Sequence, residues 1–179
     1  RDDPSEKGLK SYLDKESSGQ KEEKILRSLG RVFRFRNTWF LTIAPGGIVG
    51  AVLTFSGLWG VPFLTEVYHL ENATAATLCS LVMLAWALSG PIYSLVSERI
   101  QLRRMPYLIG TMISLISWSL VFLIPGWSLG VLSLLLFLAG FFSGGMILGF
   151  AQGKETLPLS LSGTVSGVIN MGVLTGPML

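Results

Sequence analysis

The chain has 179 residues, a mass of 19.4 kDa and a mean hydropathy of +0.56, and only 14% of its residues are charged. Soluble domains carry about 25% charged residues, so an ordinary soluble globule is excluded. Residues 1–36 hold ten of the fourteen Lys and Arg and seven of the eleven Asp and Glu. The basic pI therefore arises from a polar N-terminal segment and one short loop, and it does not indicate nucleic-acid binding.

Residues 1–36 form the first predicted unit, a cytoplasmic loop. Residues 1–23 are rich in Lys, Asp, Glu, Ser and Gly, which predicts a flexible linker. Over residues 24–35 the spacing predicts a short amphipathic helix, which either lies on an anionic cytoplasmic membrane surface or packs on the body of the protein. Its two faces are Ile25, Leu26, Leu29, Val32 and Phe33 on one side and Lys24, Arg27, Arg31 and Arg34 on the other.

Five apolar segments follow, each near the roughly 20 residues that a helix needs to cross a bilayer. Residues 37–65, 72–97 and 105–153 contain no Asp, Glu, Lys or Arg. The last of these is long enough for two crossings, separated by the turn Pro125-Gly126-Trp127. The fifth segment begins near Pro158. The predicted transmembrane region is 37–179, with helices at about 38–64, 73–97, 105–124, 128–152 and 158–179.

The loops alternate in positive charge, which predicts the orientation. Ten Lys and Arg precede the first helix, and then none, three, none and one lie in the successive loops. Because positive residues stay in the cytoplasm, the N-terminal segment, the loop at 98–104 and the loop at 154–157 are expected inside. His69 and the turn at Pro125 are expected outside.

Glycine is concentrated in three of the five helices. The first, fourth and fifth carry small-xxx-small pairs, which let helix backbones approach closely in lipid. Suppose that the first three helices form one unit and the next two begin another. The first helix of each unit is then the glycine-rich one, and these two helices cross the membrane in opposite directions. That arrangement predicts an inverted three-plus-three repeat, an architecture of transporters; the alternative is that glycine is simply frequent in membrane helices. The pairs are 46/50, 140/144, 145/149, 163/167 and 172/176.

The most specific motif is the loop Gly90-Pro91-Ile92-Tyr93-Ser94-Leu95-Val96-Ser97-Glu98-Arg99-Ile100-Gln101-Leu102-Arg103-Arg104. It resembles the loop signature of the major facilitator superfamily, Gly-x-Leu-(Ala/Ser)-Asp-Arg-x-Gly-Arg-Arg, found between the second and third helices of each six-helix half. The residues that fit it are Leu95, Ser97, Arg99, Arg103 and Arg104. Five residues depart from it: Ser94 stands for glycine, Val96 and Glu98 for Leu/Ala and aspartate, Gln101 for glycine and Leu102 for a basic residue. The stretch 56–63 and the segment 154–171 also look like bacterial members of this family.

The resemblance implies an all-α membrane protein in which residues 24–179 are the central loop and the seventh to eleventh helices. It also implies part of a secondary transporter that moves a small solute by alternating access, possible proton coupling, and a multi-pass place in the bacterial inner membrane. The partners are then the solute, the lipid bilayer and a first six-helix half of the same chain. A membrane scaffold or enzyme subunit is the alternative function.

The candidate functional residues lie in the loop and in two helices. A carboxylate beside arginines can form contacts that break when a helical bundle rocks, so Gly90, Glu98, Arg99, Arg103 and Arg104 are the predicted gating motif. Asn170 is a candidate for contact with the cavity, with an interhelical hydrogen bond as the alternative. Trp59 is a candidate for the cavity or for the interfacial aromatic belt. Catalytic, cofactor and metal sites are not expected, because the single Cys79 and the isolated His69 form no such motif.

Overall fold

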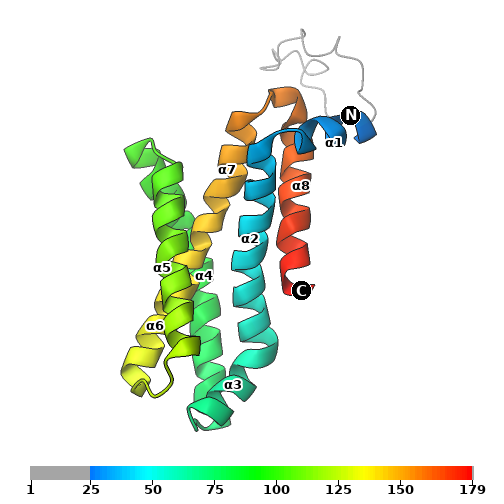
Figure 1. Ribbon diagram of the computed structural model, residues 1–179. Helices are drawn as coiled ribbons and strands as arrows, with labels where there is room; N and C mark the ends of the chain where they lie inside the picture. The colour runs from blue at the N-terminus through cyan, green and yellow to red at the C-terminus, as the bar shows by residue number, and fades with distance from the viewer. Residues whose placement is uncertain (1–24, 179) are drawn as a thin grey trace, which may run out of the picture.

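The structure is a computed structural model that describes residues 25–178, and the predicted linker at 1–23 lies outside the described residues. This part of the chain is helical, and the predicted all-helical class is confirmed. Figure 1 shows a bundle of long, roughly antiparallel helices with α1 lying across one end. The elements are α1 Ile25–Phe33, α2 Arg36–Thr54, η3 Phe55–Trp59, α3 Gly60–Val67, α4 Asn72–Ile100, α5 Arg104–Leu123, α6 Leu129–Ser143, η4 Gly144–Met146, α7 Ile147–Thr156, η5 Leu159–Leu161, α8 Ser162–Thr175 and η6 Gly176–Met178.

Four continuous helical runs are long and apolar enough to cross a membrane: Arg36–Val67, Asn72–Ile100, Arg104–Leu123 and Leu129–Thr156. They correspond to the first four predicted helices. In the fifth predicted segment, α8 spans 14 residues between single 3₁₀ turns. At 1.5 Å per residue it covers about 21 Å, less than the roughly 30 Å of the hydrocarbon core. The described residues therefore contain four full spans and one shorter helix.

Helix α2 crosses α8 with glycine against glycine. A methyl group on Gly46 would lie 2.5 Å from the carbonyl oxygen of Gly172, and one on Gly50 would lie 2.8 Å from the carbonyl of Gly176. The predicted pairs 46/50 and 172/176 thus pack against each other. Because the nearest atoms belong to the backbone, no side-chain rearrangement could make room for a larger residue here.

Helix α6 crosses α4 in a similar way. A methyl group on Gly140 would meet the backbone carbonyl oxygen of Val82 on α4, and one on Gly144 would meet the side chain of Ser89. The two crossings are reciprocal: the first helix of each predicted unit packs on the second helix of the other unit. This exchange is what the predicted inverted repeat requires. The pair at 163/167 differs, since both glycines face open space.

Helix α5 lies at the edge of the bundle and packs mainly on α6 and its continuation. Ser114 of α5 and Ser143 of α6 join the two helices through a hydrogen bond of 2.9 Å between their hydroxyl oxygens. Its outer face is apolar and more than half exposed, as expected for a helix that contacts lipid. The exposed side chains are Leu108, Ile109, Met112, Leu115, Ile116 and Leu123.

The helical run from α2 to α3 is interrupted by a π-helical turn, Phe55–Trp59. The amide of Gly60 donates to the carbonyl of Phe55, five residues earlier. A methyl group on Gly60 would lie 2.5 Å from Sγ of Cys79, so the turn ends where the chain presses against α4. π-helical turns are rare in proteins, and those that do occur often lie at functional sites.

Helix α1 packs its apolar face on the body of the protein. Val32 is fully buried in a cluster with Leu41 of α2 and Val165 and Ile169 of α8. Leu29 and Phe33 pack against the same cluster. Leu29, Val32 and Phe33 therefore contact the rest of the protein, whereas Arg27 and Arg34 are exposed.

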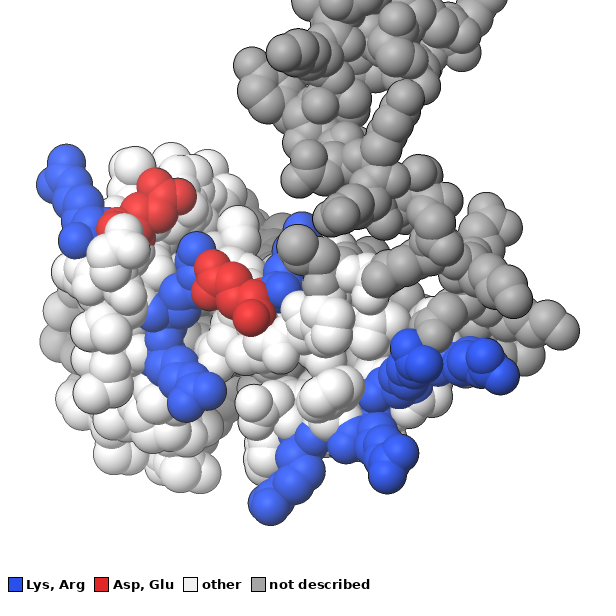
Figure 2. Space-filling model, turned by 90° about the horizontal axis from the view of Figure 1, so that it is seen from above, with Lys and Arg blue, Asp and Glu red and all other residues white. Residues whose placement is uncertain are grey.

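The charges of the described residues are divided between the two ends of the bundle. All eight Lys and Arg of residues 25–178 lie at the end that carries α1, together with Glu98 and Glu155. Figure 2 views this end, and basic side chains spread over it with acidic side chains among them. Glu66 and Glu71 lie at the other end. The bundle thus has one basic face and one weakly acidic face.

Candidate functional site

The candidate site lies at the basic end, where the sharp turn from α4 to α5 approaches the end of α7. Helix α4 terminates at Gln101, which has a left-handed backbone with φ of 54°. The turn is tied by two hydrogen bonds, from Ser97 Oγ to the carbonyl of Leu102 at 3.0 Å and from Gln101 Nε2 to the carbonyl of Glu98 at 2.6 Å. This conformation explains why the family signature has glycine at the position of Gln101, since glycine adopts it without steric cost.

An ion pair joins this turn to α7. Arg103 donates from Nε to Oε2 of Glu155 at 2.7 Å, and its Nη2 lies 2.6 Å from Oε1 of the same carboxylate. Two parallel contacts between a guanidinium and a carboxylate fix orientation as well as distance. The two side chains are 34% and 54% exposed, so water competes for both. An exposed pair of this kind is worth roughly 0–1 kcal/mol, which makes it easy to form and easy to break.

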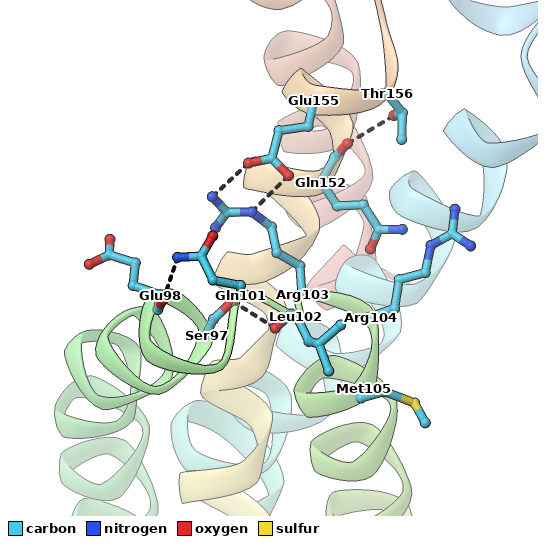
Figure 3. A pocket seen from close by; sticks show the side chains of 10 residues that line it. All are labelled: Ser97, Glu98, Gln101, Leu102, Arg103, Arg104, Met105, Gln152, Glu155 and Thr156. Atoms are coloured by element: carbon cyan, nitrogen blue, oxygen red, sulfur yellow. Dashed lines mark hydrogen bonds and ion pairs between the residues drawn. The ribbon is translucent and has the colours of Figure 1, made fainter.

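A pocket of about 370 Å³ surrounds the pair. Figure 3 shows it between the α4–α5 turn and the last turn of α7, with Arg103 reaching across to Glu155. Most of the residues that line it are polar, and they come from both elements, so a change in the tilt of α7 would open or close it. The lining residues are Ser97, Glu98, Gln101, Leu102, Arg103, Arg104, Met105, Gln152, Glu155 and Thr156.

The remaining members of the predicted gating motif lie around this pair. The carboxylate of Glu98 points away from the pair in Figure 3, and within residues 25–178 it has no ion pair. Arg99 is exposed on the last turn of α4. Gly90 lies where α4 passes α7, and a methyl group there would be 3.9 Å from Cδ1 of Ile147. Arg104 begins α5 and extends away from the pair. The gating role of all five residues stays a prediction.

The two candidate cavity residues lie elsewhere. Asn170 is exposed on α8, and Trp59 is exposed at the end of the π-helical turn. Neither belongs to the pocket at the basic end. Their predicted contact with a solute remains a prediction.

Glu155 is the residue that the sequence motif did not include. It lies 52 positions after Arg103 and outside the loop signature. A signal for it was present in the charge pattern, because the loops at 98–104 and 154–157 are predicted on the same side of the membrane. Each of these loops carries one carboxylate, so the arginines had two candidate partners rather than one.

The fold and the site together define a class. Long apolar helices cross a membrane, glycine crossings are exchanged between two helix units, and a breakable ionic contact lies at the basic end. Such features belong to polytopic membrane proteins. A family model described as Major Facilitator Superfamily matches residues 2–179, and the chain therefore belongs to the major facilitator superfamily. A comparison with curated proteins gives no match.

Membership of this family assigns the chain a transporter-type function and a multi-pass position in a membrane. The predicted resemblance is thereby confirmed. Among the described residues, no group of three or more His, Cys, Asp or Glu could hold a metal ion.

Proposed function

We propose that this chain is part of a secondary transporter that moves a small solute by alternating access, together with a first six-helix half. The observation that carries the proposal is the bidentate pair between Arg103 and Glu155 at the end of α7. Helix α7 continues α6 through the 3₁₀ turn Gly144–Met146, so the hydrogen-bond pattern changes at this point within one continuous helical run. A stretch of 3₁₀-helix inside a longer helix often marks a functional hinge.

In this mechanism the pair holds the end of α7 against the α4–α5 turn in one conformation. When α7 tilts at the 3₁₀ turn, the guanidinium and the carboxylate separate and both return to water. An energy difference of about 1.4 kcal/mol changes the ratio of two states about tenfold. A contact worth roughly 1 kcal/mol therefore biases the two states without locking either one. Glu98 and Arg99, exposed beside the pair, are available for contacts in the other conformation.

We also propose that the basic end faces the cytoplasm. The support is the position of every Lys and Arg of residues 25–178 at that end, which is the distribution that the positive-inside rule describes. In intact cells, a cysteine at Glu71 should then react with an impermeant thiol reagent added outside, and a cysteine at Gln101 should not. The reverse labelling pattern would overturn the orientation.

The transport mechanism is tested with the full-length protein in proteoliposomes. Solutes that raise its Tm are measured for uptake, and spin labels at Gln101 and Thr156 report the distance across the pocket. Two distance populations are expected, with their ratio changed by a transported solute and by Glu155→Gln. A single population that responds to neither change would contradict alternating access at this end.

A further inference from the structure

A second hollow lies beside the candidate site, on the side of the bundle. It is a groove of about 300 Å³ between the first turns of α2 and of α5, and Gln152 of α7 also lines it. Its walls are apolar and include Phe40, Leu41 and Leu108. Phe40 is 68% exposed and Leu108 is 52% exposed. Both belong to membrane-spanning helices, so the groove opens sideways toward lipid.

The rim of the groove is polar and positively charged. Arg104, Asn37 and Gln152 line it, and within residues 25–178 none of their side chains makes a hydrogen bond or an ion pair. In Figure 3, Arg104 extends away from the pair of Arg103 and Glu155. A guanidinium and two amides together present several N–H donors to one point. Oxygens that carry negative charge, such as those of a phosphate, match this set of donors.

Tyr107 forms part of the groove wall, and its hydroxyl group is buried. Tyr107 lines the groove and is only 8% exposed, and its hydroxyl oxygen has no hydrogen-bond partner among the described residues. This hydroxyl oxygen is enclosed by the protein and does not face the groove.

The groove also lies at the depth of a membrane interface. Residues Arg36 and Arg104 are the first residues of two membrane spans, so the rim lies where hydrocarbon meets headgroups. Trp39, beside the groove on α2, is 51% exposed and donates from its indole nitrogen to the carbonyl of Phe33 at 3.0 Å. An amphipathic aromatic ring in this position is typical of the headgroup level.

We propose that this groove binds one anionic phospholipid. The phosphate would accept hydrogen bonds from Arg104 and the amides of Asn37 and Gln152. An acyl chain would occupy the apolar walls. Basic pockets between membrane helices bind acidic lipid headgroups by this chemistry. The sideways opening favours a lipid over a free anion or an acidic peptide, because those approach from water.

The test measures lipid binding to the purified full-length protein by native mass spectrometry, titrated with phosphatidylglycerol or phosphatidylcholine. Arg104→Gln should weaken phosphatidylglycerol binding by on the order of fivefold, the effect of one basic residue at an anionic surface. Arg104→Lys should retain most of the binding. The matched control is Arg99→Gln, which removes the same charge from the same end of the bundle but lies outside the groove.

A second variant tests the acyl-chain part of the site. Leu108→Trp narrows the groove from an exposed position, so it should weaken binding of phosphatidylglycerol while the rim stays intact. The proposal is overturned if Arg104→Gln and Arg99→Gln have equal effects, if phosphatidylcholine binds as tightly as phosphatidylglycerol, or if inorganic phosphate at millimolar concentration displaces the lipid. Binding is measured without transport, so this result and the test of the transport mechanism can fail independently.

Discussion

The α2–α8 crossing and the pair of Arg103 and Glu155 hold the molecule together in opposite ways. At the crossing, the backbones of Gly46 and Gly172 meet inside the membrane, and neither helix has a side chain between them. At the basic end, two long side chains span the gap between α5 and α7, and both are partly in water. The first contact depends on close packing and therefore does not respond to salt. The second depends on charge, and water can replace either side chain as the partner of the other.

The difference teaches where this bundle can move. Helices that meet through glycine backbones cannot separate slightly without losing most of their dispersion contact, since that attraction falls steeply with distance. An exposed ion pair loses little free energy when it breaks. We therefore expect the α2–α8 crossing to persist in every conformation and the contact between α5 and α7 to change.

The largest expected effect comes from filling the crossing. Gly172→Leu should prevent folding or lower the free energy of unfolding by more than the roughly 1–3 kcal/mol typical of overpacking, because the blocking atoms are backbone. Gly167→Leu is the matched control on the same helix, since Gly167 faces open space. The measurement is the Tm of the purified full-length protein. Equal Tm values for the two variants would contradict the crossing.

The second expected effect separates the two glycine crossings. A methyl group on Gly144 meets the side chain of Ser89, whereas one on Gly46 meets backbone. Gly144→Ala should therefore be destabilising by roughly 1–3 kcal/mol, and Ser89→Gly should restore part of that loss in the double variant. Unfolding in a mild denaturing detergent measures both.

The same logic supplies the control for that experiment. The stability lost in Gly46→Ala should not be restored by shortening a neighbouring side chain, for example by Thr42→Ala. Rescue of Gly46→Ala by a side-chain change would show that the α2–α8 crossing is not limited by backbone contact.

The third expected effect lies at the ion pair. Glu155→Gln should change the free energy of unfolding by no more than about 1 kcal/mol. It should nevertheless alter the rate of transport and the distance populations across the pocket. Arg103→Gln should produce a similar change, and the double variant should add little, because each single change already removes the pair. Strictly additive effects on transport would contradict a direct contact.

Glu98 provides a comparison within the same motif. Its carboxylate points away from the pair, so Glu98→Gln should change transport less than Glu155→Gln, with expression close to normal. A larger effect for Glu98→Gln would indicate that its contacts in another conformation are the stronger ones.

The smallest expected effect is at the turn. Gln101 adopts φ of 54°, and relief of this conformation by glycine is worth up to about 1 kcal/mol. Gln101→Gly loses the hydrogen bond to the carbonyl of Glu98, so its net effect on Tm should be a small increase or no change. A clear decrease in Tm would mean that the side chain contributes more than the backbone strain removes.

The glycine pairs show how far the sequence predicts the fold. The i, i+4 spacing marks the face of a helix that permits close approach, and this was enough to identify 46/50, 140/144 and 172/176 as packing positions. The spacing does not name the partner helix, since any small face fits another. The pair 163/167 has the same spacing and packs against nothing within the described residues.

The site was predictable to a different extent. The turn containing Arg103 follows from the loop motif, because its residues are adjacent in the chain. Its pairing with Glu155 depends on how the end of α7 is placed beside α5, and that placement comes from the crossing of α6 with α4 and α5. The spacing of residues within one helix or loop does not predict where the end of α7 lies.

The π-helical turn at Phe55–Trp59 has a consequence for how relatives of this protein should be aligned. One residue advances an α-helix by about 100°, so a turn that absorbs one extra residue lets the segments before and after it keep their own faces. Here Gly50 keeps contact with Gly176 of η6, and Leu64 stays fully buried in the cluster that includes Ala75 and Leu78 of α4. A relative with one residue fewer between Thr54 and Gly60 would have a continuous α-helix and the same two contacts. A single-residue gap within 55–59 is therefore to be read as the loss of this turn, and the helices on either side of it remain equivalent.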